Sequence, residues 1–115
     1  MVTPYVEKRD RAEWSLDRIH QLAAEQSVIY GSSRVQQTTG NLGYGLEAIC
    51  GCLLSLRSGH FRHAVRYSER GPWLDVYLIK YRGPTQQDDP LYIKLKLNRD
   101  CIQIVLCSFH LEGAL

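Results

Sequence analysis

The sequence lacks any hydrophobic run long enough to cross a membrane as a helix. A spanning helix needs about 20 consecutive apolar residues, whereas the apolar runs here are strand-sized, such as Ile104 to Cys107. Residues 1–10 carry no hydrophobic stretch of the kind found in signal peptides. These absences argue against a membrane-spanning or secreted protein, and we expect a cytoplasmic one.

Two common site signatures are also missing. The glycine-rich segment 40–45 does not end in the Lys-Ser/Thr pair of a phosphate-binding loop, so we interpret it as a connector. The four cysteines lack the two-residue gap that is common in zinc sites. We therefore predict reduced structural thiols, with metal binding as the less favoured alternative, at Cys50, Cys52, Cys101 and Cys107.

The composition is that of an ordinary globular domain. The 115 residues are 44% hydrophobic and 23% charged, enough for one core but not for two, so we predict a single domain over residues 1–115. Residues 57–100 hold nine basic and five acidic side chains, a net charge of +4 within a chain whose total is +2. This asymmetry favours a cationic surface that attracts phosphates, although an ordinary solvated face is the alternative.

The hydrophobic periodicity changes from helical to strand-like along the chain. Apolar residues recur every three or four positions in the first half, with Ser15 as a candidate N-cap, and alternate in the second half. The order predicts an α+β fold with helices packed on one face of a twisted antiparallel sheet. We predict helices at 15–26, from 31–34 onward and at 46–54, strands at 27–30, 61–68, 73–81, 91–97 and 102–109, and an exposed loop at 82–90.

The run from Leu91 to Leu97 alternates strictly, which places its four aliphatic side chains on a core face. Tyr92, Lys94 and Lys96 then share the other face, which carries one phenol and only positive charge. Packing against a neighbouring strand is an alternative explanation for Tyr92, but it does not account for the two lysines. The phenol and the two ammonium groups together favour an anionic ligand on that face.

His110 ends the last predicted strand, which we expect to lie beside the strand of Tyr92. An imidazole exchanges protons near neutral pH and a phenol holds its proton, so the pair can divide acid and base roles. With Lys94 or Arg62 balancing phosphate charge, these groups suit a metal-independent ribonuclease, because RNA supplies its own 2′-OH nucleophile. A merely exposed histidine is the alternative.

Other candidate residues have ordinary explanations. His60 and His63 lie two apart, which can suit a metal, but no carboxylate or cysteine joins them at ligand spacing. We interpret Trp73 as a core anchor rather than a base-stacking platform. We assign no function to His20.

Four short motifs follow one another along the second half of the chain: Phe61-Arg62-His63-Ala64-Val65, Trp73-Leu74-Asp75-Val76-Tyr77, Leu91-Tyr92-Ile93-Lys94 and Ser108-Phe109-His110. In this order they resemble the motifs Phe-Tyr-Lys-Ser-Met, Trp-Gln-Asp-Val-Tyr, Val-Tyr-Leu-Lys and Ser-Phe-Lys or Ser-Phe-His of the MqsR-type toxins of bacterial toxin–antitoxin systems. Gly31-Ser32-Ser33-Arg34 stands where a Thr-Arg-Ser element is usual in that family, and the similarity covers nearly the whole chain.

The resemblance implies a RelE-like fold and an mRNA-cleaving toxin without a cofactor. It implies a cognate antitoxin as partner, which binds DNA and often zinc. It assigns catalysis to Arg62, Tyr92 and His110. Leu74 replaces a glutamine of the family's active site, and Asp75 and Tyr77 are kept, with a structural role as an alternative. We predict no metal site, and RNA binding by His63, Arg66, Tyr67, Lys94 and Lys96.

Two functions therefore stay open. The first is an endoribonuclease toxin that leaves a 2′,3′-cyclic phosphate and is silenced by its antitoxin. The second is a catalytically weakened RNA- or protein-binding module of the same fold, because Leu74 and Arg62 depart from the family pattern.

Overall fold

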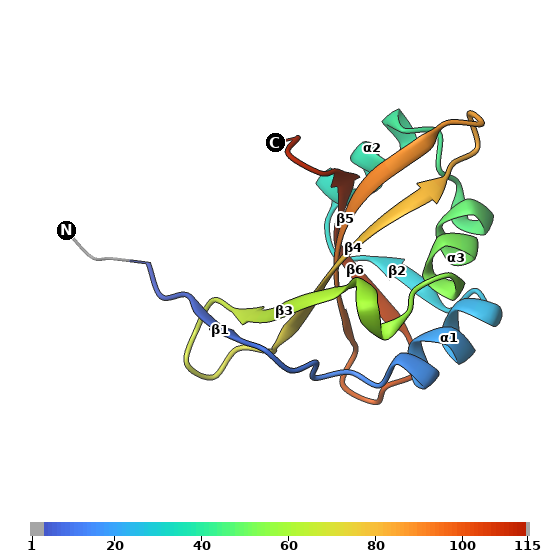
Figure 1. Cartoon of the computed structure of the whole chain (residues 1–115). Helices are drawn as coiled ribbons and strands as arrows, with labels where there is room; N and C mark the ends of the chain where they lie inside the picture. Colours follow the sequence, from blue (N-terminus) through green and yellow to red (C-terminus); the bar gives the residue numbers. More distant parts are fainter. Residues whose placement is uncertain (1–3, 115) are drawn as a thin grey trace.

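A computed structural model describes residues 4–114 and contains one mixed sheet with three helices against it (Figure 1). This confirms the predicted α+β class and is consistent with the RelE-like fold that the resemblance implies. The helices are α1 (Leu16–Ala24), α2 (Ser33–Asn41) and α3 (Leu46–Leu54), with a 3-10 turn, η1, at Ser58–His60. The strands are β1 (Glu7–Arg9), β2 (Val28–Tyr30), β3 (Phe61–Arg66), β4 (Leu74–Arg82), β5 (Asp88–Leu97) and β6 (Ile104–Leu111).

The six strands lie in the order β1-β3-β4-β5-β6-β2. All neighbouring pairs are antiparallel except β2 and β6, which are parallel, so the expected purely antiparallel sheet is mixed. β1 was not predicted, because three residues flanked by charges carry no periodic signal. Its place at the sheet edge depends on contacts with residues far along the chain.

The alternation of β5 sorts its side chains as predicted. Leu91, Ile93 and Leu95 are fully buried, and Leu97 is nearly so. The predicted loop at 82–90 is wrong in part, because β5 already begins at Asp88 and pairs with Arg82. The polar composition misled the prediction, since two long antiparallel strands extend as an exposed hairpin and need only the five residues 83–87 to turn.

The helices pack their apolar stripes against this sheet. Ser15 caps α1 as predicted, its hydroxyl accepting the N–H of Arg18, and Ile19 and Leu22 are buried. α1 and α3 lie together on one side (Figure 1), and the His20 imidazole donates through Nε2 to the carbonyl of Leu56 at 2.8 Å. α2 extends to Asn41 and so takes up the start of the predicted 40–45 connector.

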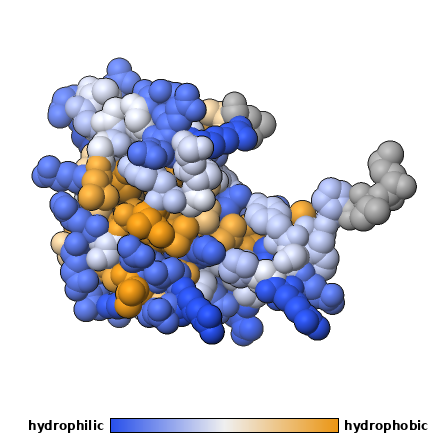
Figure 2. Space-filling view, turned by 180° about the vertical axis from the view of Figure 1, so that it is seen from behind, coloured by the Kyte–Doolittle hydropathy of each residue, from blue (hydrophilic) through white to orange (hydrophobic). Residues whose placement is uncertain are grey.

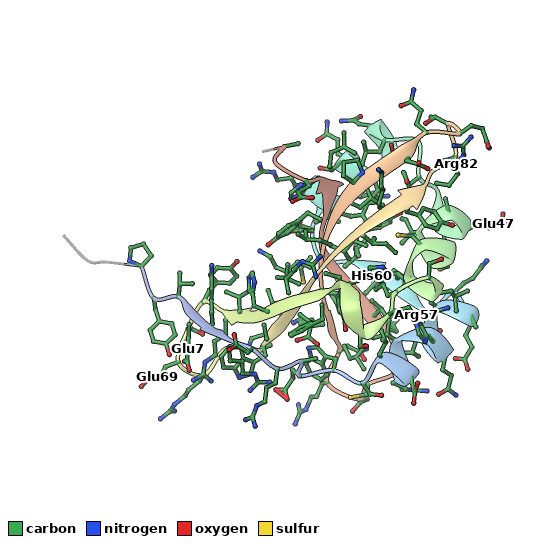
Figure 3. The ribbon with its side chains drawn as sticks, viewed as in Figure 1. Glu7, Glu47, Arg57, His60, Glu69 and Arg82 are labelled. Carbon is green, nitrogen blue, oxygen red and sulfur yellow. The ribbon has the colours of Figure 1, made fainter. Side chains whose placement is uncertain are left out.

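β1 and β3 form an arm that projects from the body of the molecule (Figure 1). The guanidinium carbons of Arg9 and Arg66 lie 4.2 and 4.7 Å from the ring centroid of Trp73, and Arg66 pairs with Glu7 at 2.7 Å. Trp73 is half-buried, so the prediction of a core anchor is wrong. From behind, hydrophobic residues gather on the body and the arm is mostly hydrophilic (Figure 2). Glu7 and Glu69 lie on the arm, far from Arg82 (Figure 3).

Within residues 4–114, no helix is long and apolar enough to cross a membrane.

Candidate active site

An open cleft of about 850 Å³ separates helix α2 from the end of the sheet formed by β5 and β6. Its size falls within the range of about 300–1,000 Å³ that ligand sites occupy. The strand wall contains Tyr92, Lys94, Cys107, Ser108, Phe109 and His110. The helix wall contains Ser32, Arg34, Val35, Gln37, Thr38 and Asn41, and Gly113 and Ala114 complete the lining.

The chain path around Gly31 creates this cleft. Strand β2 pairs only with the first part of β6, and the N–H of Gly31 then donates to the carbonyl of Leu106 at 2.8 Å. A Cβ on Gly31 would lie 3.1 Å from that carbonyl oxygen, so this close approach favours glycine. Ser32 caps the helix that follows, accepting the N–H of Val35. α2 therefore lies beside the part of β6 that β2 leaves uncovered.

Tyr92 and His110 face each other across β5 and β6, as predicted. Their rings stack with centroids 4.9 Å apart and an angle of 11° between the planes. The Nδ1 atom of His110 lies 2.8 Å from the carbonyl oxygen of Leu111. Because a carbonyl only accepts, Nδ1 carries the proton, and in the neutral ring Nε2 is left with a free lone pair. His110 is thus oriented as a proton acceptor beside a phenol.

Lys94 extends the site along the sheet from the cleft to Tyr67. Its ammonium group donates to the Tyr67 hydroxyl at 2.7 Å and lies 5.0 Å from the Tyr67 ring centroid and 5.9 Å from that of Tyr92. The three ion pairs among residues 4–114 do not use Lys94. Its positive charge therefore stays available to an anion.

Lys96 lies on the same polar face, next to a bulge in β6 at Cys107. The register passes from Lys94 opposite Ser108 to Leu95 opposite Leu106, which leaves Cys107 as the extra residue. Burial raises the pKa of the Cys107 thiol, although Lys96 and Lys94 act in the opposite direction. The thiol stays protonated at neutral pH and adds no charge to the cleft.

His63 in β3 is aligned with Lys94 in β5 across the sheet, because both pair with Val76 of the intervening strand β4. Partial burial lowers the pKa of His63, and the positive charges of Lys8 and Lys94 lower it further. The imidazole is therefore neutral at pH 7. It lies outside the cleft lining, on the sheet surface that continues from Lys94.

The structure does not bring the two predicted arginines to the cleft. The guanidinium of Arg62 donates to the carbonyls of Gly59 at 2.9 Å and Phe61 at 3.3 Å, next to a bulge in β3. Arg66 is held on the arm by Glu7 and the ring of Trp73. Their roles in catalysis and RNA binding stay predictions without support from proximity.

The motif from Trp73 to Tyr77 serves the fold. Both carboxylate oxygens of the fully buried Asp75 accept backbone N–H groups, those of Glu13 and Trp14, each at 2.9 Å. Tyr77 is buried, its ring lies in a T-shaped arrangement with that of Phe61, and burial raises its pKa to about 12. The structural alternative for these two residues therefore has direct support.

No group of three or more histidine, cysteine or acidic side chains within residues 4–114 is arranged to hold a metal ion. The Nδ1 atom of His60 instead accepts the N–H of Arg57 at 2.9 Å, where η1 leads into β3 (Figure 3). All four cysteines are free, and burial raises the pKa of Cys52 to about 12.

The sequence analysis missed the helix wall of the cleft. Arg34, Gln37, Thr38 and Asn41 recur at intervals of three or four residues, which places them on one side of α2. That polar periodicity was readable in the sequence. The position of α2 opposite Tyr92 was not, because it depends on where the chain leaves the sheet.

The chain is thus an α+β domain with an open cleft and a stacked tyrosine–histidine pair, and a family comparison defines its class. Residues 11–111 match the family model described as "Motility quorum-sensing regulator, toxin of MqsA". The chain therefore belongs to the MqsR toxin family, which makes it a toxin of a toxin–antitoxin system with an antitoxin as partner. A search of curated proteins found no match.

Proposed function

We propose that this toxin is an endoribonuclease that cleaves mRNA without a metal ion, by attack of the substrate's own 2′-OH. The observation that carries the proposal is the Tyr92–His110 stack at the cleft, with Lys94 beside it. The family match supports a toxin and leaves the reaction to be tested. By the same resemblance, the antitoxin is a DNA-binding protein that can contain zinc.

Each group has a distinct task in this reaction. The free Nε2 of His110 accepts the 2′-OH proton, and the oxygen then attacks the neighbouring phosphorus. The Tyr92 hydroxyl donates a proton to the departing 5′ oxygen, which leaves a 2′,3′-cyclic phosphate and a 5′-OH. Lys94 balances the charge that develops on the phosphate. Lys96, Tyr67 and His63 extend the RNA-binding surface, and the resemblance adds Arg62 and Arg66.

The test is cleavage of a defined RNA by folded variants, with EDTA present throughout. Tyr92→Phe removes only the hydroxyl and His110→Ala only the imidazole, and each should slow cleavage by about 10²–10⁴-fold. Tyr81→Phe is the matched control, because Tyr81 lies outside this cleft. Arg62→Ala and Lys94→Ala measure the two candidate sources of positive charge. Parent-like rates for both Tyr92→Phe and His110→Ala would remove this active-site assignment.

A binding module with weakened chemistry is the second candidate. Arg62 lies outside the cleft lining, and Leu74, at the glutamine position, pairs with Val65 outside it too. This function predicts that the parent binds RNA in a salt-dependent manner but leaves it intact in the same assay.

A further inference from the structure

The proposed reaction uses the strand wall of the cleft and gives no task to α2. The side of α2 that faces Tyr92 and His110 carries Arg34, Gln37 and Asn41, three exposed polar residues. The buried residues of α2 are Val35, which also reaches the cleft lining, and Thr39. α2 thus has buried residues that pack and a polar side that lines the cleft.

The polar side of α2 offers unused hydrogen-bonding groups. The side-chain amides of Gln37 and Asn41 make no hydrogen bond to another residue of the described chain, whereas the Thr38 hydroxyl donates to the carbonyl of Arg34 at 2.8 Å. An amide presents an acceptor and two donors side by side, the pattern that pairs with the edge of a nucleobase. Such groups in a cleft suit a ligand that carries both donors and acceptors.

The strand wall narrows the class of ligand. Single-stranded RNA is recognised through unstacked bases that lie on aromatic rings and form hydrogen bonds along their edges. Tyr92 and His110 supply stacked rings on one wall, Lys94 supplies a cation, and the two amides supply edge contacts on the other.

We infer that α2 sets the sequence preference of cleavage. Gln37 and Asn41 bind the edge of the base next to the scissile phosphate, and Arg34 holds a neighbouring phosphate. This inference rests on the proposed function and deepens it, because it separates the groups that read the RNA from the groups that cut it. The chemistry stays with Tyr92 and His110.

The test compares two glutamines that are adjacent on the same helix. Both are exposed, but Gln37 lines the cleft and Gln36 lies outside the lining. The parent, Gln37→Ala, Asn41→Ala and Gln36→Ala each cut a pool of random RNA, and the cleavage sites are sequenced. We expect Gln37→Ala and Asn41→Ala to weaken discrimination at one base position by about 10-fold or more. Gln36→Ala should keep the parent's preference.

The possible outcomes test the role of α2 separately from the proposed ribonuclease activity. A parent that cuts selectively, with unchanged preferences in Gln37→Ala and Asn41→Ala, overturns the inference and leaves the ribonuclease intact. Equal loss in Gln36→Ala overturns it too, because the helix as a whole would then be responsible. If the parent does not cut RNA, the proposed function fails. Binding to uncleavable 2′-O-methyl oligonucleotides of different sequence then tests base preference, and equal affinity of parent and variants for every sequence overturns the inference.

Discussion

At the scale of single residues, Asp75 shows how one side chain fixes a distant segment. Its carboxylate lies in β4 and accepts the N–H groups of Glu13 and Trp14, which precede α1. The carboxylate thereby joins the N-terminal segment to the middle of the sheet. Because Asp75 is fully buried, water cannot replace either hydrogen bond.

Asp75→Asn should therefore lower the free energy of unfolding by about 1–3 kcal/mol at pH 7, because an amide has one acceptor oxygen and leaves one backbone N–H unpaired. Urea denaturation measures the change. Asp88→Asn is the control. The carboxylate of Asp88 is exposed, and its oxygen lies 3.7 Å from the guanidinium nitrogen of Arg82. Such a surface ion pair contributes about 0–1 kcal/mol. Equal effects of the two substitutions would contradict this account of Asp75.

His63 makes stability depend on pH. Burial and the charges of Lys8 and Lys94 lower its pKa in the folded protein below the ordinary value of about 6.5. As the pH falls through 6.5, the unfolded chain takes up this proton before the folded protein does, so stability falls. We expect His63→Gln to lose less stability than the parent between pH 8 and pH 5, as measured by the denaturation midpoint. Identical losses would show that another group is responsible.

At the scale of elements, the edge strand β1 is held to the arm by side-chain contacts as well as by its pairing with β3. β1 is three residues long and lies at the sheet edge, and Arg9 and Arg66 both lie over the ring of Trp73. A guanidinium over an aromatic ring near the protein surface contributes about 0.5–1 kcal/mol. Two such contacts add to the stabilisation that the three-residue pairing of β1 with β3 supplies.

Trp73→Leu should release β1 while the rest of the sheet stays folded, because leucine offers no ring face to the two arginines. Hydrogen exchange at the amides of residues 7–9 should accelerate far more than exchange in β5. Tyr67→Leu, also next to the arm but in contact with Lys94, is the control. Unchanged exchange in β1 would show that the ring contacts do not hold the strand.

At the scale of the whole molecule, the toxin class predicts a cellular effect. Production of this protein without its antitoxin should arrest bacterial growth, and co-production of the antitoxin should restore it. Under the proposed chemistry, Tyr92→Phe and His110→Ala should permit growth at equal soluble expression. Growth curves with quantified soluble protein provide the measurement. Normal growth with abundant soluble parent would contradict the predicted toxicity.

Several parts of this structure were predictable because they repeat locally. The alternation of β5, the cap at Ser15 and the amphipathic helices each depend on residues a few positions apart. The approach of His110 to Tyr92 followed from pairing adjacent strands. The strand β2 was predicted, but its parallel pairing with β6 was not, and β1 and the start of β5 were missed. Each of these depends on contacts between distant residues or on pairing that composition hides.

The sequence by itself determined the α+β class, the core face of β5, and the phenol and ammonium groups on its other face, because side-chain direction follows from backbone periodicity. Only the tertiary structure decided which of the candidate residues meet. In the folded chain Arg62 donates to the carbonyl of Gly59, and Arg66 pairs with Glu7. Asp75 accepts backbone N–H groups, and α2 lies across a cleft from Tyr92. These outcomes depend on strand order, a bulge and one close approach at Gly31, which arise from packing over the whole chain.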